Sequence, residues 1–101
     1  MTAFLHHKLP DIRVLCISHQ VRSLFAFGSV LRSDFGPESD IDLLVEFDSS
    51  SHANTFRNFF DLKEKLEHLL GRPVDLITTR SISNPFFKEE VDSTKTTLYA
   101  A

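Results

Sequence analysis

Two short groups of residues carry functional groups at a spacing that suits metal and phosphate chemistry. Asp40 and Asp42 lie two residues apart where the apolar run Ile41–Phe47 begins, and Gly28-Ser29 end an earlier apolar run. Side chains alternate across a strand, so the two aspartates should project from one face, about 7 Å apart at their Cα atoms. Carboxylates so placed can bind Mg²⁺, which completes its shell with water and substrate phosphates.

The Gly28-Ser29 pair is suited to binding phosphate. Gly28 permits a tight turn and a close approach of the backbone, and Ser29 lies where a short helix is expected to begin. Free N–H groups at a helix start, next to a hydroxyl, bind anions. Arg32 is interpreted either as a phosphate contact or as a solvated helix residue. Together with Asp40 and Asp42, these residues predict a site for a metal–nucleoside triphosphate.

A third carboxylate, Asp75, lies within the short apolar segment Val74–Thr78. An unpaired charge is costly to bury in such a strand. If this strand neighbours Ile41–Phe47, Asp75 can reach the same metal or accept a proton from an attacking hydroxyl. A lone Asp-x-Asp is a weak signal, since solvated aspartates on edge strands are common. The combination with a glycine turn and a third strand carboxylate is far more specific.

The hydrophobic pattern predicts the elements that must position these residues. Alternation predicts a strand over Ile41–Phe47, and short apolar runs predict strands over 23–27 and Val74–Thr78. Helices are expected over residues 11–20, 29–34, 54–70 and 86–92, the third ending at Gly71, and a strand or tail over 96–99. This order predicts one domain over residues 1–101 of the α/β (α+β) class. Its small mixed sheet would have three or four strands, with helices packed mainly on one face.

Composition and charge exclude several classes of protein. The formal net charge is −3 with no Lys/Arg run, so a protein that grips long nucleic acid unaided is not expected. No apolar run can span a bilayer, and residues 1–10 lack a signal-peptide core, so we expect a soluble cytoplasmic protein. The single cysteine, Cys16, excludes an intrachain disulfide and lies among apolar residues, which favours burial.

The remaining aromatic and histidine residues give a weaker signal. Ten phenylalanines are more than a small core readily hides, so they are expected either to fill the core or, in part, to lie at an interface. Phe86 and Phe87 are open to both interpretations. The five histidines share no metal-ligand spacing, and most are expected at the surface: His6, His7, His19, His52 and His68.

The segment from Gly28 to Phe47 resembles the nucleotidyltransferase signature of the DNA polymerase β-like superfamily. It is most similar to the minimal nucleotidyltransferases, in which Gly-Ser-x-x-Arg-Gly precedes a short acidic loop and Ser-Asp-Ile-Asp-Leu-Leu-Val. Arg32 and residues 39–45 match this pattern, whereas Ser33 stands where the family has its second glycine. Residues 74–77 resemble the family's third-carboxylate strand. The likeness extends over residues 11–99 and implies the nucleotidyltransferase fold.

The resemblance implies a protein adenylyltransferase that serves as the antitoxin of a HEPN-domain ribonuclease toxin. It implies transfer of AMP from ATP to a hydroxyl of that toxin, expected to be a tyrosine, with two Mg²⁺ ions as cofactors. The implied catalytic and metal-binding residues are Asp40, Asp42 and Asp75, and the implied nucleotide contacts are Gly28, Ser29 and Arg32.

Two alternatives to this activity remain. One is a non-catalytic, nucleotide-binding antitoxin that neutralises its partner by complex formation. The other, nucleotide addition to an RNA 3′ end, is disfavoured by the acidic balance. Homo- and hetero-oligomers are both compatible with the sequence.

Overall fold

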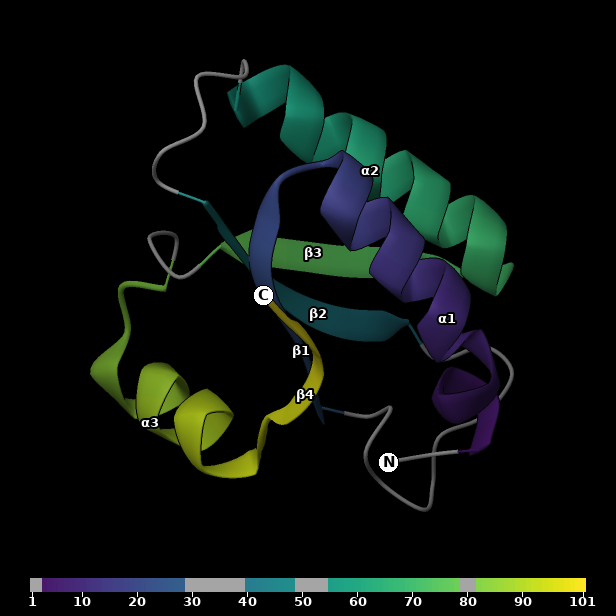
Figure 1. The fold of residues 1–101 in the computed structure, drawn as a ribbon. Helices are drawn as coiled ribbons and strands as arrows, with labels where there is room; N and C mark the ends of the chain where they lie inside the picture. The colour runs from purple at the N-terminus through teal and green to yellow at the C-terminus, as the bar shows by residue number, and fades with distance from the viewer. Residues whose placement is uncertain (1–2, 29–39, 49–54, 79–81) are drawn as a thin grey trace.

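The computed structural model describes residues 3–28, 40–48, 55–78 and 82–101, and Figure 1 shows their arrangement. The four strands of the described residues form one mixed sheet in the order β3-β2-β1-β4. The elements in chain order are α1 (Ala3–Ser18), β1 (Val21–Phe27), β2 (Ile41–Phe47), α2 (Thr55–Leu70), β3 (Val74–Thr78), α3 (Pro85–Thr94) and β4 (Thr96–Ala100). The predicted fold class is confirmed, and the last segment is a strand rather than a tail.

The inner strand β2 links the segments that carry the candidate residues. It pairs antiparallel with β1 on one side and parallel with β3 on the other. A parallel pair needs a long crossover, and α2 provides it. Gly71 ends that helix as predicted, with a φ of 66° and its N–H donating to the carbonyl of Glu67 at 2.8 Å. The sharp end of α2 fixes where β3 begins beside β2.

The two faces of the sheet are covered by different helices. Alternate residues of β2 (Ile41, Leu43, Val45) lie in the main core with buried residues of α1 and α2. Leu44 points to the other face, where it packs with Phe27 and with Val91 of α3. Figure 1 shows α1 and α2 side by side and α3 set apart from them. Two of the three described helices therefore share one face, and α3 partly covers the face that also carries Asp42.

α1 is longer than the sequence predicts, because it begins at Ala3 and contains Pro10 instead of starting after it. Proline lacks the N–H that would complete the helical hydrogen-bond ladder, so it was expected at the helix start. However, Leu5 is fully buried, and Phe4 and Leu9 pack against the main core. Burial of this apolar first half stabilises the helix enough to offset the missing hydrogen bond.

Among the helices of the described residues, none is long and apolar enough to cross a bilayer. The exposed large apolar side chains lie instead at scattered positions on all three helices: Val14, Ile17, Phe56, Phe60, Phe86 and Phe87. The prediction that ten phenylalanines exceed the core is thus confirmed for four of them.

Candidate active site

Asp42 and Asp75 lie opposite each other on neighbouring parallel strands. In the register of β2 and β3, Asp42 pairs with Asp75, one step after Ile41 pairs with Val74. Paired residues on adjacent strands project from the same face of a sheet. Since Ile41 and Val74 face the main core, both aspartates face the other side, toward the layer of α3. The structure thus brings together two of the three predicted carboxylates.

Asp40 lies immediately before β2, two residues from Asp42. The alternation of the strand places its side chain on the same face as that of Asp42. Asp40 and Asp75 are exposed, and Asp42 is half-buried. The exposure of two of these carboxylates keeps them accessible to a charged ligand, while the half-buried Asp42 is held between its neighbours on β1 and β3.

Gly28 follows β1 and lies against the carboxylate of Asp42. Phe27, the residue before it, is the register partner of Asp42 across the β1–β2 pair. A Cβ atom added at Gly28 would collide with Oδ2 of Asp42 and lie 3.2 Å from its Cγ. The φ of Gly28 is 71°, a conformation that residues with a side chain rarely adopt. Both the space and the backbone therefore require glycine here.

A pocket of about 560 Å³ opens beside this pair of residues. The sheet supplies Phe27, Gly28 and Asp42 to its lining, and α3 supplies the other side. The α3 residues in the lining follow the spacing i, i+3, i+4 and i+7 of one helix face: Phe87, Glu90, Val91 and Thr94. Small-molecule sites are concave and of this size.

Sequence reasoning missed α3 as a wall of this pocket. The signal for the helix itself is plain, because Pro85 occupies its first turn and the side chain of Asn84 accepts hydrogen bonds from the N–H groups of Phe86 and Phe87. The spacing of the lining residues marks one face. What the pattern does not reveal is which face of the sheet that helix covers.

The donor chemistry of the three aspartates fits Mg²⁺, which prefers hard carboxylate oxygens. The Asp42 carboxylate has room beside residue 28 only because glycine has no Cβ atom. Among the residues that the structure describes, no three His, Cys, Asp or Glu side chains are gathered closely enough to hold an ion. Ser29 and Arg32, the other predicted contacts, lie outside the described residues.

Cys16 and His19 lie on the other side of the sheet from this pocket. Cys16 is fully buried in the main core, and burial raises the pKa of its thiol to about 12. The thiol is therefore no nucleophile at neutral pH, and its burial confirms the sequence prediction.

His19 departs from the expected surface position. It is buried, and its Nε2 lies 2.6 Å from Oδ2 of Asp61 on α2. His6, His7 and His68 are exposed. The carboxylate bonded to His19 explains why this one histidine can be buried.

Comparison with known proteins places these features in a family. A model of the nucleotidyltransferase domain matches residues 12–96. A protein of Methanocaldococcus jannaschii that is named as a protein adenylyltransferase is 41% identical over 80 residues, which cover 79% of each chain. The residues that the family model matches include β1, β2 and β3, the glycine turn and the candidate carboxylates.

Solved structures share the fold. One described as a minimal nucleotidyltransferase is 33% identical, with a TM-score of 0.74 over 91% of this chain and 90% of that one. Another is described as a tri-AMPylated HEPN toxin of Shewanella oneidensis in complex with its minimal nucleotidyltransferase antitoxin. That likeness covers 96% of this chain and 73% of the other, at 21% identity and a TM-score of 0.66, and shows the fold alone.

Proposed function

Because this chain belongs to the nucleotidyltransferase domain family, we propose that it transfers AMP from ATP to a partner HEPN-domain ribonuclease toxin and so acts as its antitoxin. The observation that carries the proposal is the meeting of Asp42 with Asp75 across β2 and β3, with Gly28 closed against Asp42. A nucleotidyltransferase needs carboxylates at a phosphate-binding turn, and these residues supply both.

Each residue has a distinct part in the proposed reaction. Gly28 and Ser29 contact the phosphates through their backbone N–H groups, and Arg32 contributes positive charge. Asp40, Asp42 and Asp75 would hold Mg²⁺, with two ions expected. Mg²⁺ bound there would neutralise triphosphate charge and lower the pKa of an incoming hydroxyl. In the proposed transfer, the acceptor oxygen bonds to the α-phosphorus, pyrophosphate leaves, and Asp75 takes the hydroxyl proton.

The choice of acceptor rests on the family. The Methanocaldococcus jannaschii relative is named for transfer to protein, and the Shewanella oneidensis antitoxin is bound to an AMPylated toxin. A protein acceptor brings its own surface to the site, which suits a pocket that is lined by α3 and the sheet and by no further domain within the described residues. Within such a toxin, a tyrosine hydroxyl is the acceptor that we expect.

A second function is favoured by a specific observation. Phe56 and Phe60 of α2 and Phe86 of α3 expose large apolar surfaces. Exposed apolar side chains suit a protein interface. An antitoxin that neutralises its toxin by contact alone would need that surface and no chemistry.

Co-expression with a HEPN-domain protein encoded beside this chain distinguishes the two functions. If transfer is required, Asp42→Asn abolishes protection of the cells while the two proteins still purify together. If contact suffices, the same variant protects as well as the natural protein. Protection by Asp42→Asn at equal expression would therefore overturn the proposed transfer and leave the binding function.

A further inference from the structure

The pocket beside Asp42 has one end suited to phosphate and another end that the proposed reaction does not use. Gly28 and Asp42 form the first end, and α3 forms the second with Phe87, Val91 and the carboxylate of Glu90. A volume of about 560 Å³ exceeds what phosphates at Gly28 alone would fill. The pocket therefore has room along α3 for the rest of a larger ligand.

Phe87 offers an aromatic surface at that second end. Its ring packs edge-to-face on Phe27, with centroids 6.0 Å apart and an interplanar angle of 72°. Phe27 is itself buried in the cluster with Leu44 and Val91, so its contact with Phe87 helps to hold that ring in place. Even so, Phe87 remains 39% exposed. A large apolar side chain that is held in place yet open to a pocket is suited to stacking on a planar ligand.

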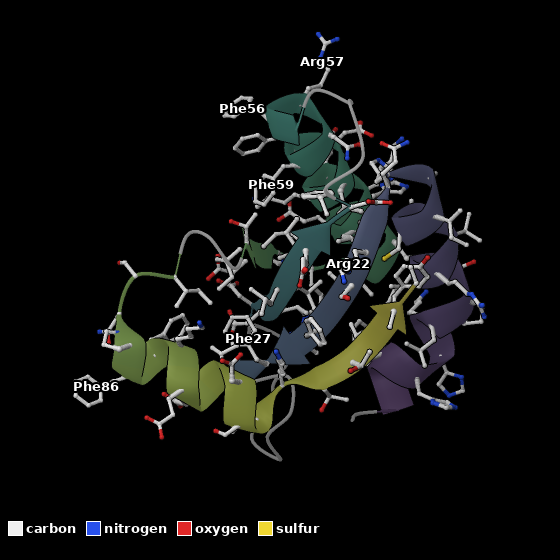
Figure 2. The ribbon with its side chains drawn as sticks, turned by 60° about the vertical axis from the view of Figure 1, so that its left-hand side comes forward. Arg22, Phe27, Phe56, Arg57, Phe59 and Phe86 are labelled. Atoms are coloured by element: carbon white, nitrogen blue, oxygen red, sulfur yellow. The ribbon has the colours of Figure 1, made fainter. Side chains whose placement is uncertain are left out.

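The neighbouring Phe86 shows that this placement is particular to Phe87. Phe86 is 81% exposed and does not line the pocket. Figure 2 shows it at the outer end of α3, pointing away from the sheet, whereas Phe27 lies on the sheet beside the same helix. The two consecutive phenylalanines therefore differ in surroundings while sharing their helix and their residue type.

We propose that the α3 face of this pocket is the nucleobase site, and that Phe87 stacks on the base of the nucleotide whose phosphates lie at Gly28 and Asp42. The inference rests on the proposed function, because it takes the ligand to be a nucleoside triphosphate. Every nucleobase has a π-face, so stacking on an aromatic side chain can hold any of them without base-specific hydrogen bonds. Glu90, one turn further along α3, presents an acceptor to amino groups at the base edge.

Calorimetry with two ligands separates the base site from the phosphate site. The dissociation constants of ATP and of inorganic tripolyphosphate would be measured with Mg²⁺ for the natural protein, Phe87→Ala and Phe86→Ala. Phe87→Ala should weaken ATP binding about tenfold and leave tripolyphosphate binding unchanged. Phe86→Ala should leave both unchanged, and Phe87→Trp should restore ATP binding, since it keeps an aromatic face.

Other outcomes would overturn the inference in distinguishable ways. Equal ATP affinities for Phe87→Ala and the natural protein would remove the base site and leave the proposed function standing. Loss of labelling of the acceptor by Phe87→Ala at unchanged ATP affinity would mean that the pocket receives the acceptor's ring instead of the base. If the natural protein binds neither ATP nor tripolyphosphate, the proposed function fails together with the base site.

Discussion

At the scale of single residues, the account depends on the contact between Gly28 and Asp42. Two glycines of the described chain have positive φ, Gly28 at 71° and Gly71 at 66°, but their surroundings differ. A Cβ at Gly28 would collide with the Asp42 carboxylate, whereas one at Gly71 would meet nothing within 4 Å. Comparison of the two glycines therefore separates two effects of a substitution: backbone strain, which both positions share, and collision with Asp42, which only Gly28 has.

Gly28→Ala and Gly71→Ala are expected to lose similar stability and different amounts of function. Each forces a residue with a side chain into the left-handed region, at a cost of about 1 kcal/mol in the free energy of unfolding. Only Gly28→Ala should also displace the Asp42 carboxylate and abolish ATP binding. Urea denaturation and calorimetry measure the two effects, and loss of ATP binding in Gly71→Ala as well would contradict the assignment.

At the scale of elements, His19 joins the end of α1 to α2. Its Nδ1 lies 2.7 Å from the carbonyl oxygen of Leu15, and its Nε2 lies 2.6 Å from Asp61. The amide of Asn58 donates to the carbonyl of His19 at 2.6 Å. The hydrogen bond from His19 and then that from Lys65 lower the pKa of the Asp61 carboxyl. These hydrogen bonds connect α2 to the short segment between α1 and β1, and so hold together the two helices that cover the main core.

The lowered pKa of Asp61 predicts a loss of stability in acid. A carboxyl whose folded pKa is depressed stabilises the fold above its unfolded value, near 3.9, and loses that contribution as the pH falls through its folded pKa. The free energy of unfolding should therefore fall less steeply below about pH 4 in Asp61→Asn than in the natural protein. Urea denaturation between pH 6 and 3 measures the free energy of unfolding of both proteins. An equal dependence on pH in the two would refute a contribution of the Asp61 hydrogen bonds to stability.

The sequence predicts the individual helices and strands better than it predicts the contacts between them. The alternation of Ile41–Phe47 and the apolar run Val74–Thr78 predict β2 and β3 with the bounds that the structure has. No pattern in either segment specifies their register, which decides that Asp42 meets Asp75. The predicted start of α1 is wrong because the burial of Leu5 overrides the preference of Pro10 for the first turn of a helix. Strand alternation places Leu44 on the same face as Asp42, and the packing of α3 explains its burial there.

At the scale of the whole molecule, the site lies on one side of the sheet and the main core on the other. The face of α1 and α2 stabilises the fold, while the α3 face carries Asp42, Asp75 and the pocket. Substitutions at the carboxylates should therefore affect ligand binding more than folding. A ligand that binds only the folded protein stabilises the whole molecule, by an amount that grows with the logarithm of its concentration relative to the dissociation constant.

Mg²⁺ and ATP together are expected to raise the melting temperature. At a ligand concentration of 100 times the dissociation constant, the gain is about 2.7 kcal/mol, which for a domain of this size shifts Tm by on the order of 10 °C. Removal of Mg²⁺ with EDTA, or the variant Asp42→Asn, should abolish most of this shift. A shift that is equally large in EDTA would show that the carboxylates do not act through a metal ion.

The most direct test of the central claim is label transfer from ATP to a protein. The purified chain would be incubated with Mg²⁺, α-labelled ATP and a lysate of its native host, beside Asp40→Asn/Asp42→Asn as control. The account predicts one labelled protein band that is absent with the control and whose mass identifies the acceptor. No labelled band from a natural protein that binds ATP would contradict the proposed adenylyl transfer and favour neutralisation by contact.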